Sequence, residues 1–190
     1  MKFRLIIVAV VAVIGGTFAA VSTAYTWMFG EGEIHVVAGE NSATVLMDGQ
    51  PLGEVSALTT ARFHVAQGGH ELTITDDETG EAQTLSVSVG GWTEVIVTTP
   101  GQCMADLDVT DGIYNSSEAE WRLKGWHGPG EIASMPSNGG TSFQDLPEEI
   151  DQYARARLLV AVPCSMEGES EAINELAALR MVLETSGTEE

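Results

Sequence analysis

The sequence predicts a mainly β protein with its folded part outside the cytoplasm. Between Thr44 and Val97, short runs of alternating apolar and polar residues are each closed by glycine or aspartate turns, a pattern typical of antiparallel strands. An uncharged apolar stretch precedes them, and two cysteines bracket the next segment of the chain. We therefore expect one N-terminal transmembrane helix, an antiparallel β-sandwich, and a small α+β module that ends in an amphipathic helix.

The expected domains correspond to these three parts. Residues 1–30 form a transmembrane anchor or a signal peptide, residues 33–99 form the sandwich, and residues 101–187 form a disulfide-closed module. The chain has 190 residues, so roughly 160 remain for folded structure after the apolar stretch, which is enough for two small domains.

The charge of the chain is strongly negative and excludes two classes of partner. The 28 acidic residues against 8 basic ones give a net charge of −20. Such a field repels phosphates, so we expect no binding to nucleic acid and no docking on anionic lipid headgroups. Three explanations remain open: a solvated surface suited to a salty medium, a calcium-binding surface, and a docking face for a basic partner.

The N-terminal stretch is long enough to cross a bilayer. Residues 5–29 carry no charge, and at about 1.5 Å per helical residue they reach ~37 Å, more than the ~30 Å hydrocarbon core. Lys2 and Arg4 precede the stretch, so the positive-inside rule keeps the N-terminus cytoplasmic and exports the rest. The alternative is signal cleavage after Ser22-Thr23-Ala24, which would yield a secreted or periplasmic protein.

Small residues recur along this expected span at intervals of four. Such a stripe lets two transmembrane helices approach closely, so it predicts a possible self-association face, although Ala and Gly are common in such segments in any case. The stripe consists of Ala12, Gly16, Ala20 and Ala24.

The sandwich is predicted from alternation and turn residues. We expect strands around Ile34–Val36 and Val45–Met47, an Asp48-Gly49 turn prolonged by Pro51 and Gly53, and then four further strands. The side chains expected to face the core of those four strands are Phe63, Val65, Leu72, Ile74, Leu85, Val87, Val89, Val95 and Val97. Serine and threonine between them predict a half-exposed sheet.

The succession of V-L-M-D-G, P-L-G-E, F-H-V-A-Q-G-G-H-E-L-T-I and L-S-V-S-V-G-G resembles the PEGA family of small extracytoplasmic β-sandwich modules. The resemblance covers residues 34–98, and a longer segment, Val55–Ala61, stands where the family has a Thr-Pro pair. It implies a non-catalytic accessory domain on a bacterial surface or envelope protein, without a family active site.

The second module begins after Thr99-Pro100-Gly101. We expect an alternating run over Met104–Thr110 with Asp106 and Asp108 facing outward, and then mostly loop between residues 111 and 142, with one strand near Glu120–Lys124. Further along, we expect a helix start at Asp145–Glu149, a strand over Arg155–Val162 and a helix over Ser170–Thr185. The apolar stripe expected on the last helix is Ile173, Leu176, Leu179 and Leu183.

Two pairs of residues are candidates for a role in this module. Cys103 and Cys164 are the only cysteines of a chain expected to be exported, which predicts a disulfide between them. Trp121 and Trp126 lie in the loop-rich stretch and either line a carbohydrate or peptide surface or are partly buried in a small core.

No residue pattern indicates catalysis, a cofactor or a metal. His64 and His70 are predicted to point to opposite faces, with His70 at the core boundary, and the Asp106–Gly112 stretch lacks the glycine and glutamate positions of an EF-hand. We expect a membrane-anchored envelope protein that acts as a non-catalytic scaffold or interaction module with an envelope or cell-wall partner. The alternative is an extracytoplasmic sensor that binds a ligand, carbohydrate or peptidoglycan through residues 111–142.

Overall fold

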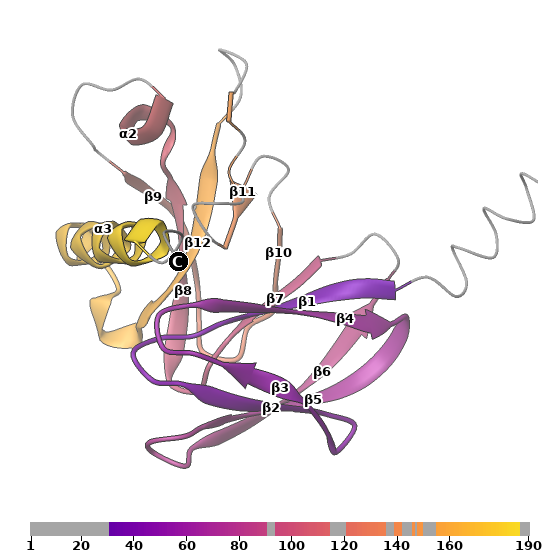
Figure 1. Cartoon of the computed structure of the whole chain (residues 1–190). Helices are drawn as coiled ribbons and strands as arrows, with labels where there is room; N and C mark the ends of the chain where they lie inside the picture. Colours follow the sequence, from indigo (N-terminus) through magenta and orange to yellow (C-terminus); the bar gives the residue numbers. More distant parts are fainter. Residues whose placement is uncertain are drawn as a thin grey trace, which may run out of the picture.

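The computed structural model describes residues 31–90, 94–114, 121–135, 139–141, 146, 148–149 and 155–186. These residues form a mainly β structure with three four-stranded sheets, which confirms the mainly β prediction (Figure 1). The expected span at residues 5–29 and its small-residue stripe lie outside the described residues. From Glu31 onward, no described helix has the length and apolar character that crossing a membrane requires.

Two of the sheets pack face to face around one apolar core. The first has the order β10-β7-β1-β4 and the second the order β3-β2-β5-β6, and every pairing within them is antiparallel except that of β1 with β7. Their strands are β1 (Glu31–Val37), β2 (Ala43–Met47), β3 (Gln50–Val55), β4 (Thr60–Ala66), β5 (Gly68–Asp76), β6 (Ala82–Val89), β7 (Glu94–Thr98) and β10 (Ala133–Ser134).

The turn between β2 and β3 has the predicted geometry, but the residues after the turn differ from the prediction. Asp48 and Gly49 both have positive φ, 51° and 75°, as a two-residue hairpin turn requires. Pro51 and Gly53 then lie within strand β3 instead of prolonging the bend. An edge strand tolerates a proline, and the absent side chain of Gly53 leaves room for the Phe63 ring.

The predicted inward faces are largely confirmed. Val65, Leu72, Ile74, Val87, Val89, Val95 and Val97 are buried in the sandwich core, where Phe63 and Leu85 are half-buried. The expected half-exposed surface is wrong for β1 and β7, because Val37 and Ile96 on their other face are also fully buried.

A third sheet covers that outer face. It has the order β11-β12-β8-β9, formed by β11 (Gly139–Gly140), β12 (Arg157–Pro163), β8 (Gln102–Asp108) and β9 (Arg122–His127). Met104, Leu159 and Ala161 of this sheet form a separate apolar cluster with Val37 and Ile96. Figure 1 shows the third sheet packed at one side of the sandwich, with β10 where the two meet.

The opposite face of the third sheet packs against the C-terminal helix, α3 (Ser170–Ser186), which comes after the short helix η2 (Cys164–Met166). Ile173 and Ala177 are buried, but Leu179, expected on the buried stripe, is 51% exposed. At about 100° per residue, Leu179 lies about 120° around the helix from Ile173. The side chain of Leu183 lies outside the described part.

The stretch expected to be mostly loop contains several short elements. A five-residue helix, α2 (Thr110–Tyr114), comes after β8, and β9 begins two residues later than expected and runs on to His127. The helix start expected at Asp145–Glu149 is not seen at its described residues, since Leu146, Glu148 and Glu149 form bends. Propensity for a first helical turn is a weak preference that tertiary contacts override.

Candidate functional site

The two cysteines are bonded to each other. Cys103 lies at the start of β8 and Cys164 at the start of η2. Their Cα atoms are 4.9 Å apart, although the two residues are separated by 61 positions in the sequence. The bond therefore ties the sheet to the segment from which α3 begins.

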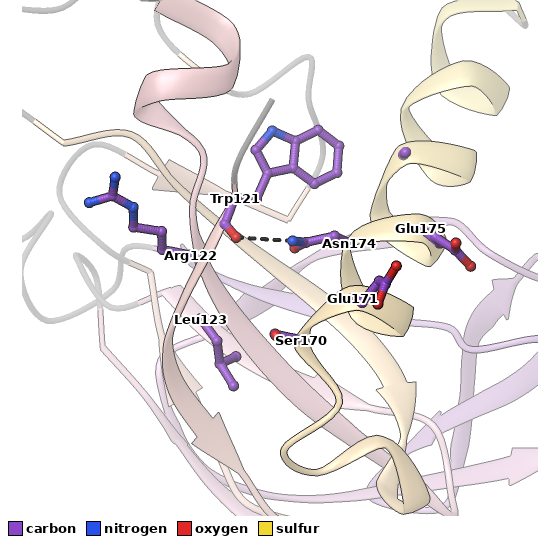
Figure 2. Close-up of a pocket in the computed structure, with 8 residues that line it drawn as sticks. Trp121, Arg122, Leu123, Ser170, Glu171, Asn174 and Glu175 are labelled. Carbon is purple, nitrogen blue, oxygen red and sulfur yellow. Dashed lines mark hydrogen bonds between the residues drawn. The ribbon is translucent and has the colours of Figure 1, made fainter. Parts of the chain in front are cut away.

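A groove of about 720 Å³ lies between the start of β9 and the first half of α3 (Figure 2). We call it the α3 groove. Its α3 wall carries residues three or four positions apart, so they lie on one side of the helix. The residues that line it are Trp121, Arg122, Leu123, Ser170, Glu171, Asn174, Glu175 and Ala178.

A hydrogen bond links the two walls of the α3 groove. Asn174 Nδ2 donates to the backbone oxygen of Trp121 at 3.1 Å, as the dashed line in Figure 2 marks. The other amide atom, Asn174 Oδ1, is buried and has no hydrogen-bond partner among the described residues. Buried acceptors usually have a partner, so this oxygen marks a position where a donor would be favourable.

The charges around the α3 groove are mainly negative. Glu171 and Glu175 are exposed and one helical turn apart, and Glu171 lies in the first turn of α3, where an acid is favoured by the helix dipole. Arg122 on the opposite wall is engaged elsewhere, since its Nη2 lies 3.5 Å from Asp111 Oδ2.

The tryptophans predicted as a ligand surface differ in position. Trp121 lines the α3 groove but is only 6% exposed and belongs to the apolar cluster beneath α3. Trp126 is half-buried against the same cluster and does not line the groove. Both positions agree with the alternative of partial burial in a small core.

The aspartates predicted to face outward on β8 are buried instead. Asp106 Oδ1 accepts a hydrogen bond of 2.8 Å from Arg157 Nε, and a second contact joins Oδ2 to Nη2. Asp108 accepts from the Thr110 N–H at 3.1 Å. Burial raises the pKa of Asp108, but the hydrogen bonds from Thr110 and the charges of Lys124 and Arg155 outweigh burial and lower the pKa overall. The error arose because β8 is covered on both faces.

The histidines do not form a metal site. His64 is 65% exposed and lies 3.3 Å from Glu33, whereas His70 lies on another strand and contacts Asp48 at 2.8 Å. Asp111, in the stretch compared above with an EF-hand, faces Arg122 and Arg155. In the part of the chain that the structure describes, no three His, Cys, Asp or Glu side chains converge as metal ligands would.

Sequence reasoning missed the α3 groove because its walls are about 50 residues apart in the chain. The only local signal was the spacing of Glu171, Asn174, Glu175 and Ala178 on one side of a predicted helix. Comparison of the chain with protein-family models, curated proteins and solved structures finds no match.

Proposed function

We propose that this protein is anchored in the membrane by residues 5–29 and acts outside the cytoplasm as a non-catalytic scaffold or interaction module of a bacterial envelope. The PEGA-like sandwich, residues 34–98, would then be the rigid part that presents the second module to a partner. This is the function that the residue pattern and the geometry support best.

The bond between Cys103 and Cys164 is the observation that carries the proposal. Disulfides persist in oxidising compartments and are rare in the cytosol. The uncharged N-terminal run supplies both the export route and the tether. The apolar cluster between β1, β7 and the third sheet supports a scaffold role, because it joins the sandwich to the groove-bearing module.

Fractionation and thiol labelling test this proposal on the full chain. The protein should be found in the membrane fraction, its folded part should be accessible to protease from outside, and neither thiol should alkylate under denaturing conditions without reductant. Alkylation of both thiols, or recovery in the cytosol, would count against export. A mature N-terminus at Tyr25 would replace the anchor with a cleaved signal peptide.

Chemical cross-linking followed by co-purification from membranes tests the interaction role. A partner should be recovered at a stoichiometry that is constant between preparations. If the chain is recovered alone from cross-linked membranes, the scaffold role is wrong.

A second candidate is a sensor that binds a small ligand, carbohydrate or peptidoglycan through residues 111–142. The observation in its favour is the α3 groove, because three of its lining residues, Trp121, Arg122 and Leu123, belong to that stretch. Thermal unfolding of the full chain in detergent, with sugars, peptidoglycan fragments or calcium added, distinguishes the two candidates. A reproducible rise in Tm with one of these ligands favours the sensor.

A further inference from the structure

We propose that the α3 groove binds lysine or arginine side chains of an extended basic segment of a partner protein. This inference names the partner chemistry of the interaction module and rests on the function proposed above.

The lining of the α3 groove suits a side chain that is apolar along its length and cationic at its end. Leu123 and Ala178 are half-buried apolar residues of the two walls. Glu171 and Glu175 are exposed beside them. Lysine and arginine bury their aliphatic stems on apolar surface while the charged head stays at a polar rim. The α3 groove offers the same arrangement, with apolar walls beside exposed carboxylates.

The glutamates have no competing cation within the described residues. No ion pair engages Glu171 or Glu175 there, and the nearest lining cation, Arg122, is directed to Asp111 at 3.5 Å. A guest ammonium or guanidinium would therefore meet two carboxylates, one helical turn apart, that no ion pair engages in the described part of the chain.

The length of the depression indicates an extended segment instead of a single small molecule. A second hollow of about 510 Å³ shares Ser170, Glu171 and Glu175 with the α3 groove and continues to Gly168 and Glu169. The two hollows thus run along the start of α3, with a third glutamate at the far end. Successive basic residues of one chain could occupy both.

The charge of the whole chain favours the same partner. The net charge is −20, and Lys124 is the only lysine after Lys2. A field of this sign accelerates encounter with basic partners at low ionic strength, whereas the groove decides where they dock.

Binding of a fluorescein-labelled hexalysine peptide to the full chain in detergent, measured by fluorescence anisotropy, tests the proposal. The variant Glu171→Gln/Glu175→Gln should bind roughly fivefold more weakly or worse, because two ion pairs are lost. The matched control, Glu54→Gln/Glu78→Gln, removes the same charge from exposed positions on the sandwich and should change affinity less than about twofold. Equal weakening by both variants, or no binding of hexalysine at all, would overturn the proposal.

Stem length provides an independent test. A hexamer of 2,4-diaminobutyric acid has the same number of amines on shorter stems and should bind more weakly than hexalysine to the unmodified protein. Equal affinity for the two peptides would show that charge alone is recognised, and it would refute the proposal that the α3 groove binds the side-chain stems. If these peptide experiments contradict binding in the α3 groove but cross-linking still recovers a partner, the proposed interaction role remains and only the docking site is wrong. If the chain is not exported, the proposed function fails whatever the peptide does.

Discussion

His35 Nδ1 lies 3.3 Å from Thr141 Oγ1 although 106 positions separate the two residues, and both side chains are buried. On the other side of the ring, His35 Nε2 lies 3.3 Å from Glu33 Oε2. A neutral imidazole with its proton on Nε2 satisfies both contacts, since it donates to the carboxylate and accepts from the hydroxyl. Thr60 Oγ1 also donates to the Thr141 backbone oxygen at 3.1 Å, so β1 and β4 both hold this distant segment.

We expect the contribution of His35 to the stability of the fold to decrease as the pH falls. Burial, the largest effect, lowers the pKa of His35 despite the hydrogen bond to Glu33, and the charges of Arg62 and Glu94 oppose each other. The unfolded chain takes up a proton at a pH of about 6.5, whereas native His35 stays neutral to lower pH. The stabilising contribution is therefore complete above pH ~6.5 and is lost progressively below it.

Urea unfolding between pH 8 and pH 5 measures this effect by comparison with His35→Gln. Both proteins share the charge change of the many carboxylates, so the informative quantity is the difference in their free energies of unfolding. The unmodified protein should lose its advantage over the variant below pH ~6.5. Parallel curves over the whole range would contradict the prediction.

His70 should behave in the opposite way. Its Nδ1 lies 2.8 Å from Asp48 Oδ2 and its Nε2 lies 2.9 Å from the Ala66 oxygen, so both ring nitrogens face acceptors. The hydrogen bond to Asp48 is the main cause that raises the pKa of His70. This contribution to stability is complete below pH ~6.5 and is lost as the pH rises through the native pKa.

The His70 titration can be measured directly by NMR in the unmodified protein and in Asp48→Asn. Asparagine tolerates the positive φ of position 48, so the turn should be retained. The titration midpoint of His70 should lie above that of an ordinary histidine and should fall in the variant. An unchanged midpoint would exclude Asp48 as the cause.

Gly53 should not tolerate a side chain. A Cβ added there would lie 2.7 Å from Phe63 Cε1, a clash that requires the ring or the edge strand to move. We expect Gly53→Ala to lower the free energy of unfolding by about 1–3 kcal/mol. Gly69→Ala on β5 is the control, because nothing lies within 4 Å of its added Cβ, and it should change stability by no more than about 0.5 kcal/mol. Equal effects in the two variants would be inconsistent with close packing at Phe63.

The features that sequence reasoning predicted correctly depend on neighbouring residues. The positive φ values at Asp48 and Gly49 result from turn chemistry, and the burial of Leu72 and Ile74 results from alternation with period two. The cysteine pair was predictable because the chain has only two.

The features that were missed depend on a second buried face. Ile96 lies in an unbroken apolar run between Val95 and Val97, and Val37 directly follows Val36, which is the signal of a strand covered on both sides. No local pattern states what covers that second face, which is here the third sheet. The same effect misled the placement of Asp106, since alternation with Leu107 suggests solvent on one side of β8. The walls of the α3 groove meet only after the third sheet and α3 have packed together.

Asp106 and Arg157 should differ in their response to substitution, because the carboxylate is almost fully buried while the side chain of the arginine is 40% exposed. Arg157→Met would leave a charged carboxylate in the interior of the sheet without its partner, and we expect a loss of about 3 kcal/mol or more. Asp106→Asn keeps the shape of the side chain, and the exposed guanidinium can turn to water, so a loss of about 1 kcal/mol is expected. Urea unfolding at pH 7 measures both as shifts of the midpoint at a constant m value. If Asp106→Asn proved as costly as Arg157→Met, the two partners would carry equal desolvation penalties, and the burial of Asp106 would not be the reason that this pair matters.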